Sequence, residues 1–191
     1  MGETVVDVYV THWSLSLLAR EQSALAILKL ADAGTGDLQI LLGDLNAEPH
    51  EASVGFLRGD AMLGSGDGCD GGGDGDSSGN SGNCGSVGGI RGDFKDAWLE
   101  LHAEPPLGST EEKYRNGAFT FPSNNPTKRI DYVFYRVGPA ARQGTASSVT
   151  GQAPTAATTH LATEGAGMLD DGGPVWASDH RAVVADILLL I

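Results

Sequence analysis

The chain has 191 residues, 40% of them hydrophobic, and a formal net charge of −13. This size and composition fit one soluble globular domain, and no apolar run approaches the roughly 20 residues that cross a bilayer. The acidity weakly disfavours binding to nucleic acid, because a polyanion is repelled unless a basic patch or a divalent metal intervenes. No secretory signal is visible at the N-terminus, which leaves the compartment open.

The first part of the chain predicts alternating strands and helices. Apolar alternation indicates a half-buried strand that ends at His12. Ser14 or Ser16 can cap a helix that runs to about residue 33. An unbroken apolar run at 38–42 indicates a strand covered on both faces, and a short helix is expected over 50–63. This helix has an apolar stripe with spacing near 3.6, formed by Leu17, Leu18, Leu25, Leu28 and Ala31 and interrupted once by Glu21.

Residues 64–89 have a different composition from the rest of the chain. Gly, Ser, Asp and Asn dominate, so this stretch cannot bury enough apolar surface to fold. We predict a disordered surface insert that protrudes from the domain. Its cysteines, Cys69 and Cys84, lack neighbours at zinc-site spacing and are expected to be free thiols.

The second part of the chain is richer in strand signals. An amphipathic pattern over 93–105 predicts a short helix, and 117–127 is an extended, turn-rich piece. Residues 128–137 alternate clearly as a strand, whereas 138–174 predict a long loop with one weak strand. A last strand should begin at Ala182. Helices and strands that alternate first and strands that dominate later predict an α/β fold with a mixed sheet.

Six polar residues lie at or inside the predicted strands, mostly at their ends. Each has an ordinary explanation alone, such as an Asx-turn, a packed histidine or a helix cap. Together they suit phosphoester chemistry, because carboxylate and amide oxygens bind a hard divalent cation and a His beside an Asp serves as a general acid or base. These residues are His12, Asp44, Asn46, Asp131, Asp179 and His180.

Several segments resemble, in the same order, the endonuclease/exonuclease/phosphatase superfamily, the metal-dependent group that contains deoxyribonuclease I. They read "YVTHW", "GDLNAEP", "DAWLELH", "FTFPS", "KRIDYVF" and "SDHRAVVADI". The resemblance runs from about Val5 to Ile191. It implies a single domain over 1–191 with a four-layer α/β sandwich of the deoxyribonuclease I-like type. It also implies a phosphoester hydrolase dependent on Mg²⁺ or Mn²⁺.

The resemblance also implies roles for individual residues. Asp44 is similar to the acid that orients or activates the attacking water, and Asn46 to the amide that contacts phosphate or metal. Asp179 resembles a metal-ligating or His-orienting acid, and His180 the general base that contacts phosphate. Asp44, Asn46 and Asp179 are thus the implied metal ligands.

His12 is similar to the second histidine of the family, with Asp131 as its expected carboxylate partner. The family also carries an Asn and a metal-binding Glu in its first half, and no segment before His12 resembles them. We therefore expect the C-terminal part of a longer enzyme, incomplete at its N-terminus, with a bare edge strand. On its own, this chain should bind metal loosely and turn over poorly.

The alternative is a truncated or degenerate binding or regulatory module without catalysis. The sequence does not distinguish nucleic acid, lipid head groups and inositol phosphates as substrates, because the same chemistry serves all three.

Overall fold

The computed structural model describes residues 3–63, 91–111, 117–139, 150–151, 156–160, 178–187 and 189–190. The expected disordered insert at 64–89 and both cysteines lie outside these ranges. The elements are β1 (Val6–His12), α1 (Leu17–Ala33), β2 (Leu38–Asp44), α2 (Ala52–Arg58), β3 (Lys95–Asp96), β4 (Asp131–Val137), β5 (Thr150–Gly151), β6 (Ala156–His160), β7 (Ala182–Asp186) and β8 (Leu189–Leu190).

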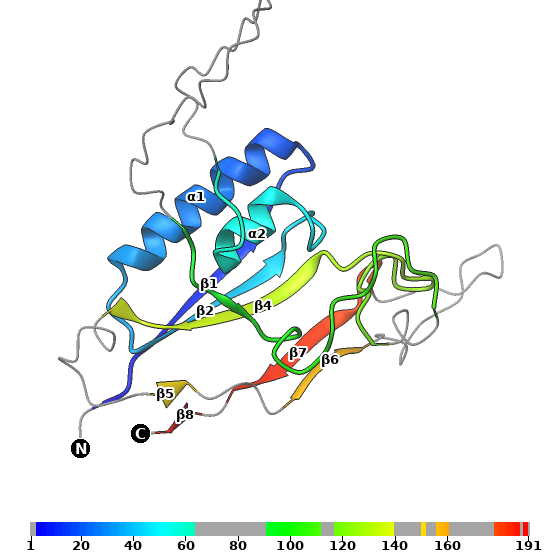
Figure 1. Cartoon of the computed structure of the whole chain (residues 1–191). Helices are drawn as coiled ribbons and strands as arrows, with labels where there is room; N and C mark the ends of the chain where they lie inside the picture. Colours follow the sequence, from blue (N-terminus) through cyan, green and yellow to red (C-terminus); the bar gives the residue numbers. More distant parts are fainter. Residues whose placement is uncertain are drawn as a thin grey trace, which may run out of the picture.

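The central feature is a four-stranded sheet with the order β1-β2-β4-β3. β1 and β2 run parallel, whereas β4 is antiparallel to both β2 and β3. Figure 1 shows α1 and α2 on one face of this sheet, with the β6–β7 and β5–β8 pairs beneath the other. The predicted α/β class and mixed sheet are therefore confirmed.

The core lies between the helices and the sheet. From α1 it receives Leu28 and Ala31, as the sequence predicts, and also Ala24. Leu17 and Leu18, in contrast, are 55% and 66% exposed. The predicted apolar stripe is therefore wrong in its first turn, where both leucines stay largely exposed.

The second helix, α2, is shorter than the predicted range of 50–63. It begins at Ala52 and ends at Arg58. Gly59 follows with a φ of 85°, a left-handed conformation that glycine adopts without strain, and its N–H donates to the carbonyl oxygens of Gly55 and Phe56. The helix ends at this cap, so the apolar residues beyond it do not extend it.

The helix predicted over 93–105 is absent. Instead, Lys95 and Asp96 form β3, which pairs with β4, and turns follow. The Asp96 carboxylate accepts a hydrogen bond from the Trp98 backbone N–H at 3.0 Å, an Asx-turn that competes with helix formation. This segment pairs with the edge of the sheet instead of forming a helix. Such pairing is a tertiary contact, so the local periodicity of the sequence does not predict it.

The region predicted as a long loop with one weak strand contains two described strand pieces, β5 and β6. β6 pairs with β7, the strand predicted from Ala182, and β5 pairs with β8. The rest of that loop lies outside the described residues.

The outer face of β1 is apolar and open. Val6, Val8 and Val10 are 38%, 56% and 73% exposed, and β2 is the one described strand that pairs with β1. This matches the expected edge strand, whose free backbone groups and apolar row favour association with another chain. No helix in the described ranges is long and apolar enough to cross a membrane.

Candidate active site

Three of the predicted residues form a row across neighbouring strands. His12 of β1 is in register with Asp44 of β2, which is in register with Asp131 of β4. Adjacent strands lie about 4.8 Å apart, so Asp44 separates His12 from Asp131 by two strand spacings. The predicted pairing of Asp131 with His12 is therefore wrong, and the register of the sheet is the reason.

Gly43 allows the row to form. It has a φ of 141°, and a Cβ at this position would lie 1.8 Å from the carbonyl oxygen of Thr11. Any other residue would push β1 away from β2 where His12 and Asp44 meet.

Asp44 and Asn46 form both an ordinary turn and a polar contact surface. One carboxylate oxygen of Asp44 accepts a 2.8 Å hydrogen bond from the Asn46 backbone N–H, and Asn46 has a φ of 47°. The Asn46 amide donates to the carbonyl oxygen of Trp13 at 2.9 Å and lies 3.1 Å from Nε2 of His12. The other Asp44 oxygen lies 3.3 Å from the same His12 nitrogen. The Asx-turn thus holds both side chains against His12.

His180 is the partner that Asp131 does have. Its Nδ1 lies 2.9 Å from Asp131 Oδ2, and its Nε2 lies 3.8 Å from Asp44 Oδ2. The Phe121 ring packs against the imidazole with the ring centroids 4.9 Å apart. The carboxylate fixes one ring nitrogen, so the other faces Asp44 and the open cleft.

The loop that carries His180 is tied to residues 120–123. The Ser123 N–H donates to the carbonyl oxygen of Asp179 at 2.7 Å, and the Arg181 N–H donates to that of Thr120 at 2.8 Å. The Thr120 hydroxyl also accepts the Asp131 N–H at 3.3 Å. Thr120 and Phe121 therefore help to place Asp131 and His180. Their roles were missed from the sequence, although the "FTFPS" segment already pointed to this stretch.

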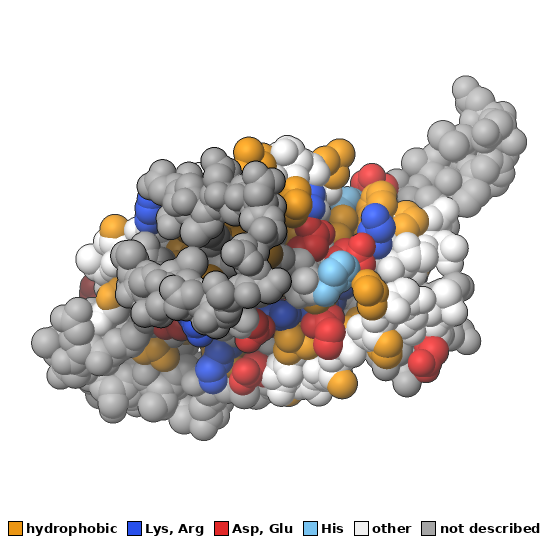
Figure 2. All heavy atoms as spheres, turned by 45° about the horizontal axis from the view of Figure 1, so that its top comes forward, with side chains coloured by type: hydrophobic (Ala, Val, Ile, Leu, Met, Phe, Trp, Pro, Cys, Tyr) orange, Lys and Arg blue, Asp and Glu red, His pale blue; other side chains and the backbone are white. Residues whose placement is uncertain are grey.

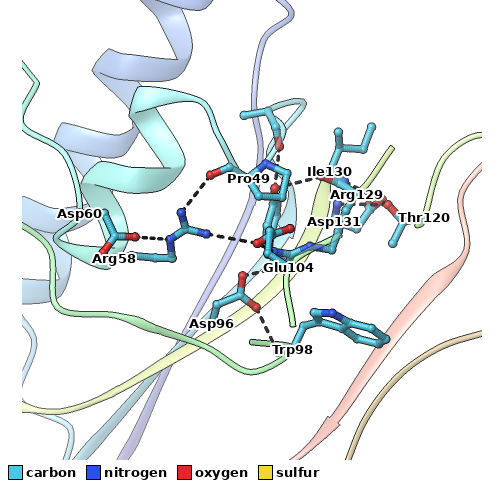
Figure 3. Close-up of polar contacts among 12 residues, drawn as sticks. Pro49, Arg58, Asp60, Asp96, Trp98, Glu104, Thr120, Arg129, Ile130 and Asp131 are labelled. Carbon is cyan, nitrogen blue, oxygen red and sulfur yellow. Dashed lines mark hydrogen bonds and ion pairs between the residues drawn. The ribbon is translucent and has the colours of Figure 1, made fainter. Parts of the chain in front are cut away.

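A buried ion-pair network supports the start of β4 (Figure 3). Arg129 is 3% exposed and donates to Asp96 at 2.8 Å and to Glu104 at 2.9 Å. Arg58 lies 3.7 Å from the same Glu104 carboxylate and 2.7 Å from Asp60. Arg129 lies two residues before Asp131, and its ion pairs hold this part of the chain in place. This agrees with the predicted structural role of Arg129.

All six predicted residues line one open cleft of about 680 Å³. Within it, ligand atoms of Asp44, Asp131 and His180 all lie within 4.8 Å of one another. Asp179 lines the same cleft but is exposed and lies outside this cluster. The cleft is bordered by His12, Trp13, Ser14, Leu15, Asp44, Asn46, Phe121, Asp131, Asp179 and His180.

The donor set of this cluster fits a hard divalent cation. Asp44 and Asp131 offer carboxylate oxygens, the ligands that Mg²⁺ and Mn²⁺ prefer. Asn46 lies beside them, with its amide nitrogen on Trp13 and His12. The metal roles predicted for Asn46 and Asp179 stay predictions.

We expect the pKa of the His180 imidazole to lie above its ordinary value of about 6.5. Burial alone would lower this pKa, but the hydrogen bond and charge of Asp131, helped by Asp44 and Asp179, outweigh burial and raise it. Asp131→Asn should therefore lower the midpoint in a metal-free NMR titration of the imidazole protons. Asp60→Asn, which removes a carboxylate paired with Arg58, should leave it unchanged.

The sign of this shift defines its effect on stability. A raised folded-state pKa stabilises the fold below the unfolded pKa, and this stabilisation is lost as the pH rises through the folded value.

In the NMR titration, an unchanged midpoint of His180 in the Asp131→Asn variant would contradict the pairing of His180 with Asp131.

Comparison with curated proteins gave no match. Among solved structures, TDP2 of D. rerio complexed with a single-strand DNA product has a TM-score of 0.49 and 18% identity, covering 95% of this chain and 55% of that one. A mannosyl-6-phosphatase of Bacteroides thetaiotaomicron has a TM-score of 0.46 and 15% identity, covering 95% and 50%. The chain thus spans about half the length of these structures. The model of the endonuclease/exonuclease/phosphatase family matches residues 2–180, and the chain belongs to that family.

Proposed function

We propose that this chain is a divalent-metal-dependent phosphoester hydrolase, or the C-terminal part of one, that uses Mg²⁺ or Mn²⁺. The finer fold, a four-layer sandwich of the deoxyribonuclease I-like type, belongs to the same proposal. One observation carries it: the ligand atoms of Asp44, Asp131 and His180 converge within 4.8 Å in an open cleft. Family membership over residues 2–180 supports the same reaction class.

In this proposal, Asp44 and Asp131 hold the cation, which when bound neutralises phosphate charge and lowers the barrier to attack by water. Asp44 also orients the attacking water, because its carboxylate faces the cleft between the two histidines. Asp131 fixes His180 through Nδ1, which leaves Nε2 to donate a hydrogen bond to a phosphoryl oxygen or to move a proton.

His12 and Asn46 act from the other side of Asp44. The Asn46 amide is held by the Trp13 carbonyl oxygen at 2.9 Å and does not need to reorganise during the reaction. The second N–H of this amide lies against His12 Nε2 at 3.1 Å, and it stabilises charge that develops on a phosphoryl oxygen that takes the place of that contact. His12 is exposed at the edge of the cleft and can contact the substrate directly.

The test is hydrolysis of bis(p-nitrophenyl) phosphate and p-nitrophenyl phosphate by the purified chain, with Mg²⁺, with Mn²⁺ and with EDTA. Because this chain alone is expected to bind metal loosely, we expect slow turnover that needs the metal and is removed by EDTA. No turnover of either ester under any of these conditions would contradict the proposal and favour a non-catalytic binding module.

A further inference from the structure

The cleft does not end at the Asp44–Asp131–His180 cluster. A second hollow of about 340 Å³ continues from it, and the two share Leu15, Asn46, Phe121 and His180 as lining residues. His180 and Asn46 therefore border open space on both sides. A phosphate held at the cluster has room for one substituent in the cleft and for another in the hollow.

Among the described residues, Lys128 is the basic side chain of this hollow that no ion pair holds. Arg20 also lines the hollow, but Arg20 is held by the Glu51 carboxylate and the Leu15 carbonyl oxygen. Lys128 is exposed and, within the described part of the chain, makes no ion pair. On the face that Figure 2 draws, Lys and Arg side chains are interleaved with acidic and histidine side chains, so the net charge of −13 does not make that face uniformly acidic.

The backbone of Lys128 is fixed by hydrogen bonds, whereas its side chain is exposed. Its N–H donates to the carbonyl oxygen of Phe121 at 3.0 Å, and its own carbonyl oxygen accepts the Thr120 N–H at 2.7 Å. These bonds join Lys128 to the segment that packs on His180. The Lys128 side chain therefore extends from a fixed backbone position close to His180.

The rest of the lining defines the kind of group that fits. Leu15, Phe121 and Ile130 offer apolar surface, and Glu48 offers a carboxylate opposite in charge to Lys128. A second bare phosphate would meet Lys128 but be repelled by Glu48. A polar organic group with both hydrogen-bond acceptors and donors, such as a sugar or a heterocyclic base, can satisfy both side chains.

We propose that the substrate is a phosphodiester whose second ester substituent, a polar organic group, lies in this hollow against Lys128 and Glu48. The inference rests on the proposed function. In the reaction, the oxygen of water bonds to phosphorus and one P–O ester bond breaks. The departing oxygen takes up a proton and leaves as an alcohol, and the remaining product is a monoester. In this proposal, the single substituent of a monoester lies in the cleft and leaves the hollow empty.

The test measures equilibrium binding by calorimetry in the presence of Mn²⁺. The two probes are thymidylyl-thymidine phosphorothioate, a slowly hydrolysed diester, and thymidine 5′-monophosphate. Lys128→Ala should weaken diester binding about five- to tenfold, the size of a lost charged hydrogen bond near a surface, and leave monophosphate binding unchanged. Glu48→Gln should also weaken the diester alone.

Lys95→Ala is the matched control. Lys95 lies on β3, where its side chain is 54% exposed and pairs with Glu100. It should leave the binding of both probes unchanged. Equal effects of Lys128→Ala on the two probes, or no effect on either, would overturn the inference. If the chain binds the monophosphate in a metal-dependent way but does not bind the diester, the inference is overturned and the proposed function stands. Binding of neither probe would overturn both.

Discussion

Replacing Asp44 by alanine should lower kcat/KM for bis(p-nitrophenyl) phosphate by about 10²–10⁴-fold, the range for loss of a group that acts directly on the reacting atoms. Asp44 lies between the two histidines of the site, His12 and His180. Its carboxylate lies 3.3 Å from His12 and 3.8 Å from His180, and it belongs to the Asp44–Asp131–His180 cluster. The measurement is steady-state hydrolysis with saturating Mn²⁺.

The control for this loss is Asp186→Ala, which removes an exposed carboxylate on β7 outside the cleft. Its turnover should equal that of the unmodified chain. His180→Ala should resemble Asp44→Ala, because it also removes a member of the cluster. Asp44→Ala with full turnover and an unchanged thermal transition would refute the assigned role of this carboxylate.

Asp96→Ala should lower the free energy of unfolding by about 3–5 kcal/mol, the cost of leaving a buried charge without its partner. The Asp96 side chain is 1% exposed and that of Arg129 is 3% exposed, and they pair at 2.8 Å. The same carboxylate accepts the Trp98 N–H, so the turn after β3 loosens as well. Urea unfolding followed by circular dichroism measures the change.

Two further variants separate the buried pair from its exposed extension. Asp60→Ala should change stability by less than about 1 kcal/mol, because the Asp60 carboxylate is 62% exposed. The double variant Asp96→Leu/Arg129→Met should regain most of the loss, since neither charge is then buried alone. An Asp96→Ala variant as stable as Asp60→Ala would show that the network in Figure 3 does not support β4.

The strand ends were predictable because their signals are local. Apolar alternation ending at His12 and an apolar run ending at Gly43 and Asp44 each mark the last residues of a strand. The partner of Asp131 was not predictable in this way. It depends on the register between β2 and β4 and on a loop 49 residues away, which brings His180 to Asp131. Strand register is a tertiary property that no single segment encodes.

The same distinction explains the other errors. Residues 93–105 have helical periodicity, but pairing with β4 and the Asx-turn at Asp96 decide their structure. The role proposed for Lys128 has no local signal in the sequence. It depends on backbone pairing with the Phe121 segment, which packs beside His180.

The most direct test of the central claim is Mn²⁺ binding followed by electron paramagnetic resonance of the purified chain. If Asp44 and Asp131 hold a metal ion beside His180, the chain should take up Mn²⁺ saturably. Asp44→Asn and Asp131→Asn should each weaken the uptake at least about tenfold, the size of an effect expected when a carboxylate ligand loses its charge. Asp186→Asn should bind like the unmodified chain. Saturable binding that survives both cluster substitutions, or no saturable binding at all, would contradict the account.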